Sequence, residues 1–165
     1  MMEIEDLQRK LASEVQTRTF ALEIESRAEG DEDDRRVSVA FSSEEPVERH
    51  FGYEILSHVR EDMDLTFLSS GRAPLLLDHN PAQQIGVVER VELDAPARKS
   101  RAVVRFGRSE LAAEIHRDVT DQIRANISVG YTITKMDKTD EQINGRDVYR
   151  VGWFPQEVSI VSIPA

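Results

Sequence analysis

Three residues of the types used in nucleophilic acyl transfer lie in short apolar runs of this chain. His79 follows residues 75–78, Ser128 lies in the middle of residues 126–131, and Glu157 opens the last run. An imidazole can act as a general base, a hydroxyl as a nucleophile, and a carboxylate can orient the imidazole. Each type is also common as a solvated side chain at a strand edge, so the ordered set of three carries the hypothesis.

The two-residue period of a β-strand places the hydroxyl and the carboxylate on matching faces. The apolar residues of the Ser128 run stand at alternate positions: Ile127, Val129, Tyr131 and Ile133. If this set fills the interior, Ser128 stands on the outer wall of the sheet. The same period places Val158 and Ile160 inside and puts Glu157 outside. Ser128 and Glu157 are therefore expected to share an external cleft.

The proton transfers of such a site would pass through His79. The imidazole removes the Ser128 proton as Oγ attacks a carbonyl carbon, and then returns it to the leaving amine. Glu157 is the expected partner of the second ring nitrogen. Asp78 competes with it, because a turn at residues 78–81 would break the alternation that otherwise points the Asp78 side chain away from the ring. The oxyanion donors are not assigned from the sequence.

The runs around these residues resemble the capsid-maturation (prohead) proteases of tailed bacteriophages, distant relatives of the herpesvirus assemblins. The matching pieces, in chain order, are PLLLDHN at 74–80, QIGVV at 84–88, ISVGY at 127–131 and EVSIVSIPA at 157–165. The resemblance spans most of the chain from about Val37 to its end, and implies that His79 and Ser128 are the base and the nucleophile of a serine endopeptidase. The assemblin-like alternative for the third member is a second histidine. The candidates, otherwise expected at the surface, are His50, His58 and His116.

The resemblance also implies the partners. The expected substrates are scaffold and major capsid proteins, together with the protease itself, and the expected location is the interior of the assembling prohead in the cytoplasm of the bacterial host. A homo-oligomer is left open. The competing interpretation is a capsid- or scaffold-binding β-barrel without catalytic activity. A metal-dependent hydrolase ranks third, because Asp78 and His79 have no convincing third ligand in the sequence; no cofactor and no metal are expected.

Composition narrows the class of protein further. A length of 165 residues is enough for a single domain with its own core, and the absence of cysteine excludes disulfides and thiolate metal sites. A formal net charge of −10 argues against nucleic-acid binding. No apolar run approaches the ~20 residues of a membrane span, and the acidic amino terminus is unlike a signal peptide. We expect one protease domain over residues 1–165, with a helical arm at 1–16 and a barrel core at 17–165.

The hydrophobic pattern predicts a β-rich α+β fold. Spacings of three and four from Ile4 to Val15 predict an N-terminal helix, and Ser109 is a good N-cap for one long internal helix over about 109–124. Strands are predicted at 19–25, 36–41, 51–56, 75–77, 85–93, 102–106, 127–135, 148–151 and 157–163. Polar turns are predicted at 29–34 and 137–146, and residues 42–70 read largely as a loop with a possible flap. A mostly antiparallel, closed or nearly closed β-barrel would remove exposed strand edges.

Overall fold

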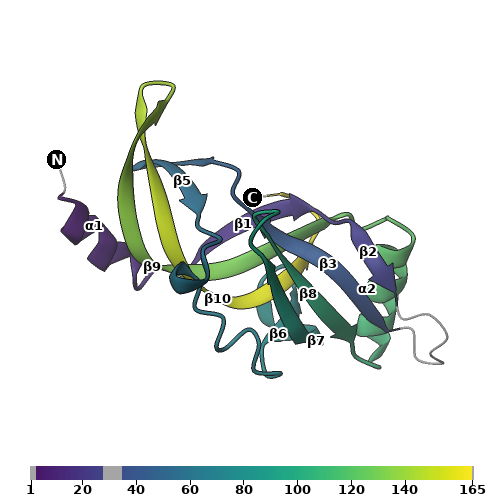
Figure 1. Ribbon diagram of the computed structural model, residues 1–165. Helices are drawn as coiled ribbons and strands as arrows, with labels where there is room; N and C mark the ends of the chain where they lie inside the picture. Colours follow the sequence, from purple (N-terminus) through teal and green to yellow (C-terminus); the bar gives the residue numbers. More distant parts are fainter. Residues whose placement is uncertain (1–2, 28–34, 165) are drawn as a thin grey trace.

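A computed structural model describes residues 3–27 and 35–164 of the chain (Figure 1). The predicted turn at 29–34 lies outside the described residues. The helices are α1 (Ile4–Leu11), a short 3₁₀ turn (Arg60–Asp62) and α2 (Glu110–Thr120). The strands are β1 (Gln16–Ala21), β2 (Ile24–Arg27), β3 (Arg36–Ser43), β4 (Val47–Arg49), β5 (Gly52–Leu56), β6 (Pro74–Leu77), β7 (Asn80–Asp94), β8 (Lys99–Phe106), β9 (Asn126–Ile143) and β10 (Arg146–Val161).

The strands form one strongly curled sheet that does not close. The strand order is β1-β9-β10-β6-β7-β8-β3-β2, with β5 and then β4 added beside β10. β1 and β2 are consecutive in the chain but lie at opposite ends of this order and do not pair with each other. The fold is thus β-rich with two α-helices, as predicted, and the predicted closed or nearly closed barrel is present only as a strongly curled half-barrel sheet.

The opening of the sheet has a local cause in the chain between β1 and β2. The single strand predicted at 19–25 is interrupted at Leu22 and Glu23, where the Leu22 N–H donates to the Ala125 carbonyl at 2.8 Å. β1 pairs with β9, and β2 pairs with β3. Splitting the strand sends its two halves to the two ends of the sheet, so only β2 pairs with the strand predicted at 36–41, which is β3.

β9 and β10 form one long hairpin where the pattern predicted a polar turn at 137–146 and two separate later strands. The ladder continues to a two-residue turn at Asn144 and Gly145, whose φ angles are 51° and 74°. An Asn-Gly pair with positive φ at both residues is the preferred type I′ turn of a hairpin. In Figure 1 the tip of this hairpin extends away from the rest of the sheet, beyond β5.

The two helices cover parts of the sheet. α1 buries Leu7 and Leu11 and contacts β9. α2 contacts β7 and β8, and its cap is as predicted, since the Ala112 N–H donates to Ser109 Oγ at 3.0 Å. The helix ends at Thr120 rather than near residue 124. None of the described helices combines the length and the apolar character that crossing a membrane requires.

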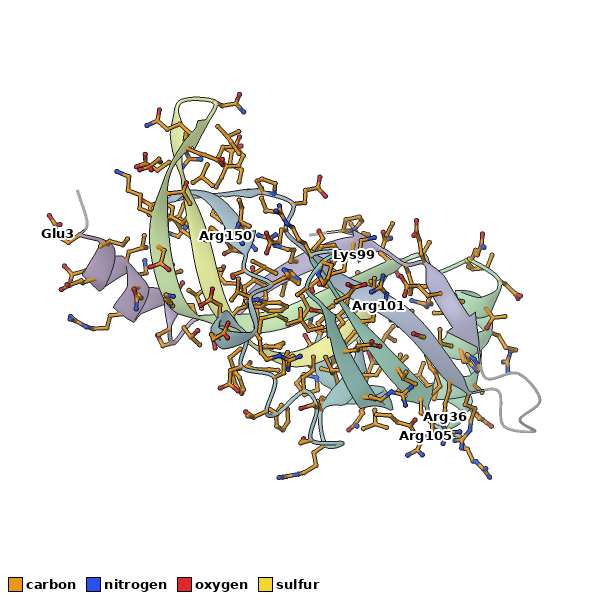
Figure 2. All side chains as sticks on the ribbon, in the orientation of Figure 1. Glu3, Arg36, Lys99, Arg101, Arg105 and Arg150 are labelled. Atoms are coloured by element: carbon orange, nitrogen blue, oxygen red, sulfur yellow. The ribbon has the colours of Figure 1, made fainter. Side chains whose placement is uncertain are left out.

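The interior of the curl is mostly apolar, and its outside is charged. Trp153 is fully buried and contacts Phe41 and Tyr131 edge to face at 6.5 and 5.7 Å between ring centroids. On the outside, Arg36 and Arg105 are cross-strand neighbours on β3 and β8, and Figure 2 shows them at one end of these strands. Both form ion pairs with Glu89 of β7 at 2.9 Å. The alternation of core and solvent residues therefore follows the strand period on this half of the sheet.

Candidate active site

The structure brings His79, Ser128 and Glu157 into direct contact. The Nε2 atom of His79 is 2.8 Å from Ser128 Oγ, and its Nδ1 atom is hydrogen-bonded to Glu157 Oε1. An ionised carboxylate only accepts hydrogen bonds, so we assign the ring proton to Nδ1. Nε2 is then the acceptor for the Ser128 hydroxyl, which is the arrangement that a general base requires.

Adjacent strands hold the hydroxyl and the carboxylate on one face. Ser128 of β9 pairs with Ser159 of β10, and Gly130 pairs with Glu157. The ladder has a register shift between Pro155 and Glu157, which places one extra residue on β10. A β-bulge re-aims the side chains that follow it. Here the bulge sets Glu157 opposite Gly130 and on the same face as Ser128.

Gly130 leaves the space that the carboxylate occupies. A Cβ atom added at this position would overlap Glu157 Oε1 and also meet Cδ at 3.2 Å. The φ angle of Gly130 is not in the left-handed region, so the glycine serves close approach and not backbone freedom. Any side chain at this position would displace the carboxylate from His79.

His79 lies in a strained two-residue turn between β6 and β7. Leu77 pairs with Asn80, and the two residues between them, Asp78 and His79, have φ angles of 50° and 57°. Left-handed backbone costs a residue other than glycine roughly 1–2 kcal/mol. The turn is tied to β10, because the Asp78 N–H donates to the Ile160 carbonyl at 3.0 Å.

Asp78 lies in this turn and not in an extended strand. The strand ends at Leu77, so the alternation that argued against Asp78 does not extend to it. Asp78 is exposed, and the partner of His79 Nδ1 is Glu157. In the structure Glu157, and not Asp78, thus lies at His79 Nδ1, and strand alternation is not the reason, because Asp78 lies in a turn.

Ser128 is fully buried, which corrects the expectation of an exposed outer wall. Its face is the predicted one, since Ile127 and Val129 belong to the core and Ser128 contacts His79. Its exposed fraction is nevertheless 0%, against 28% for the His79 side chain. Neighbouring strands flank the serine on both sides, and the imidazole lies against its hydroxyl.

The other histidines lie away from this site. His58, expected at the surface, is buried; its Nε2 atom is 2.8 Å from Ser42 Oγ and its Nδ1 atom is 2.9 Å from the Leu56 carbonyl. Burial lowers the pKa of His58, and the Leu56 carbonyl and Glu44 offset only part of that effect. His50 is exposed, as expected.

His116 is only partly exposed, because its ring stacks on Phe106 with 4.7 Å between centroids. The assemblin-like alternative places a second histidine at His79 Nδ1. Since Glu157 occupies that position, none of the other three histidines fills this role in the structure.

A buried ionic network that the sequence did not reveal fixes β9 beyond the site. Arg18 of β1 contacts Glu54 of β5 at 2.8 Å, and the Tyr131 hydroxyl donates to the same carboxylate. Arg49 donates to the Tyr131 hydroxyl at 2.9 Å. Burial and the nearby Glu54 raise the pKa of Tyr131 well above its usual value. The only sequence signal was a set of charged residues within apolar strands.

Comparison with known proteins identifies a family and includes a phage capsid protein among the similar proteins. The model of the caudovirus prohead serine protease family matches residues 38–165. A major capsid protein of Halomonas phage phiHAP-1 is 44% identical over 129 residues, which is 75% of this chain and 21% of that protein. This chain thus spans about a fifth of the length of that relative.

A solved structure shares the fold. The bacteriophage T4 capsid assembly protease, gp21, superposes with a TM-score of 0.64 over 91% of this chain and 98% of that chain, at 12% sequence identity. At this identity the similarity concerns the fold alone. The family model, by contrast, covers most of the sequence and includes all three residues of the site. The chain belongs to the caudovirus prohead serine protease family.

Proposed function

We propose that this chain is a serine endopeptidase that processes itself and the scaffold and coat proteins during capsid maturation of a tailed bacteriophage. The observation that carries the proposal is the His79 ring, joined at one nitrogen to Ser128 Oγ and at the other to Glu157. A buried hydroxyl paired with an oriented imidazole is the arrangement that activates serine as a nucleophile.

The proposed mechanism assigns one role to each side chain. His79 Nε2 takes the Ser128 proton as Oγ attacks the scissile carbonyl, and Glu157 stabilises the imidazolium that forms. The imidazolium then gives its proton to the leaving amine, which leaves an acyl-enzyme. Water, deprotonated by the same imidazole, hydrolyses the ester. His79 must be neutral at the start, because only an unprotonated Nε2 can accept the Ser128 proton.

The substrates are inferred from the relatives. The similar Halomonas phage protein is named a major capsid protein, and this chain matches only 21% of its length. That length is consistent with a protease and a coat protein joined in one polypeptide. We therefore propose coat and scaffold proteins as substrates, self-cleavage as part of the same process, and the interior of the assembling prohead as the site of action.

The alternative is a family member that binds scaffold or coat subunits without catalysis. A fluorophosphonate separates the two, because it modifies only an activated serine. We expect the wild-type chain to be labelled at Ser128. Ser128→Ala lacks the labelled hydroxyl, and its rate of self-processing should fall by on the order of a thousandfold or more. Ser42→Ala is the matched control, since Ser42 belongs to a second buried serine–histidine pair. Labelling that persists in Ser128→Ala, or an unreactive folded wild-type chain, would overturn the proposal.

A further inference from the structure

We propose that Ser159 is a positioning residue of this site, which holds the base and the acid in register. The inference rests on the proposed function and concerns a residue outside the three that carry out proton transfer. Ser159 is the β10 residue directly across from Ser128 in the sheet, and on its other side it pairs with Leu76 of β6. It therefore lies between the nucleophile and the turn that carries His79.

The Ser159 hydroxyl makes two hydrogen bonds whose directions are fixed by chemistry. The backbone N–H of His79 can only donate, so Ser159 Oγ accepts it, at 3.1 Å. The Glu157 carboxylate can only accept, so Ser159 donates its single proton to Oε2, at 2.7 Å. One hydroxyl thus connects the backbone of the base to the carboxylate that orients its ring.

The carboxylate is held at both of its oxygens as a result. Oε1 accepts from the His79 ring and Oε2 accepts from Ser159. With only the first contact, the Glu157 side chain could rotate about its terminal torsion, which is broad in the absence of packing. Ser159 fixes the plane of the carboxylate and so the direction from which it meets Nδ1.

The backbone contact matters because His79 is strained. Residues in the left-handed region persist only where their surroundings over-determine them. The two N–H groups of the turn are both bound to β10, that of Asp78 by a carbonyl and that of His79 by Ser159. Ser159 is fully buried, so bulk water cannot replace its hydroxyl without a local rearrangement.

Removal of the hydroxyl should loosen the imidazole without touching the substrate. Misplacement of a catalytic group by about 1 Å can reduce a rate by about 100-fold. We expect Ser159→Ala to lower kcat by about 10- to 100-fold with little change in KM. A purely structural role would lower the unfolding temperature instead and leave kcat per folded molecule unchanged.

The matched control is Ser100→Ala. Ser100 is also fully buried on a central strand, and within the described part of the chain its hydroxyl has no hydrogen-bond partner. Ser159→Cys is a second variant, because a thiol occupies the position but donates and accepts weakly. Each variant is assayed for cleavage of the coat protein and for the rate of fluorophosphonate labelling, at a temperature where thermal unfolding shows it fully folded. Both Ser159 variants should be slow in both assays, and Ser100→Ala should match the wild type.

A double-mutant cycle tests whether Ser159 acts through the acid. In a Glu157→Gln background, Ser159→Ala should cause a much smaller further loss than in the wild type. Equal losses in the two backgrounds, or wild-type kcat in both Ser159 variants, would overturn the inference. Failure of the proposed function is a separate result: either the folded wild-type chain would not cleave the coat protein, or Ser128→Ala would retain cleavage, whatever the Ser159 variants did.

Discussion

Glu157→Gln is the most informative single change, because it keeps the shape of the side chain and removes its charge. In the native site one carboxylate oxygen accepts from the His79 ring and the other accepts from Ser159. An amide has one acceptor and one donor in place of two acceptors. The substituted side chain can therefore fit the site in two orientations, and each has a different defect.

In one orientation the amide oxygen faces His79 and the NH₂ group faces Ser159. The ring keeps its proton on Nδ1, but no negative charge stabilises the imidazolium that forms during attack. In the other orientation the NH₂ group faces Nδ1, which must then accept, so the ring proton moves to Nε2. That nitrogen contacts Ser128 Oγ at 2.8 Å and could no longer take its proton.

The expected loss follows from comparable sites. Replacing the acid by its amide in serine proteases with a histidine base lowers kcat by about 10⁴ while the geometry is kept. For Glu157→Gln we expect a fall of about 10³ to 10⁴ in kcat, which is about 4 to 5.5 kcal/mol of activation free energy. Neither orientation creates a cavity, so the change in stability should be small by comparison.

The assay compares Glu157→Gln with Asp78→Asn on the coat-protein substrate. Asparagine tolerates the left-handed backbone of this turn, so Asp78→Asn should fold and cleave like the wild type. Single-turnover rates and circular dichroism are measured for both variants. Wild-type cleavage by Glu157→Gln, together with lost activity in Asp78→Asn, would refute the assignment of Glu157 as the orienting acid.

Two further predictions concern close approach and pH. Gly130→Ala should lower kcat by about 100-fold, because its Cβ displaces the Glu157 carboxylate; single-turnover rates measure this, and an unchanged rate would contradict the close approach. Burial lowers the pKa of His58 from 6.5, so just below pH 6.5 the unfolded chain binds more protons than the folded one. Stability should therefore decrease as pH falls through that value, and His58→Phe should weaken the dependence. Urea unfolding at pH 5 and 7 measures the effect. An equal change in the free energy of unfolding between the two pH values in both proteins would contradict it.

The strands that carry the site could be predicted because one face of each is continuously apolar. Val158 and Ile160 lie in the core as the two-residue period predicts, and so do Ile127 and Val129. The outer half of the same hairpin was predicted only in part: residues 148–151 were predicted as a strand, whereas residues 137–146, almost all of them polar, were predicted as a turn. The informative signal there was the Asn144–Gly145 pair, whose turn preference is stronger than any pattern of hydrophobicity in the flanking residues.

Pairing of strands was harder to predict than their existence. Periodicity identifies which face of a strand is buried but does not identify its neighbours. Closure was inferred from the need to hide edges, yet β1 and β2 end the sheet without pairing to each other. The burial of Ser128 could not be predicted for the same reason, because it depends on which strands lie beside β9. A polar position in an alternating strand was assumed to face solvent, whereas neighbours on β1 and β10 and the His79 ring enclose it.

The backbone at His79 has a conformation that its residue type disfavours but that the site requires. A two-residue turn with positive φ at both positions favours asparagine and glycine, as at the tip of the β9–β10 hairpin. The same geometry holds Asp and His at residues 78 and 79, where an extended strand would have carried the imidazole onward along β6. The turn instead brings the ring against Ser128, two strands away across β10. A glycine at position 79 would relieve the backbone strain but would remove the general base. The strained conformation of His79 is therefore what brings the three residues of the site together.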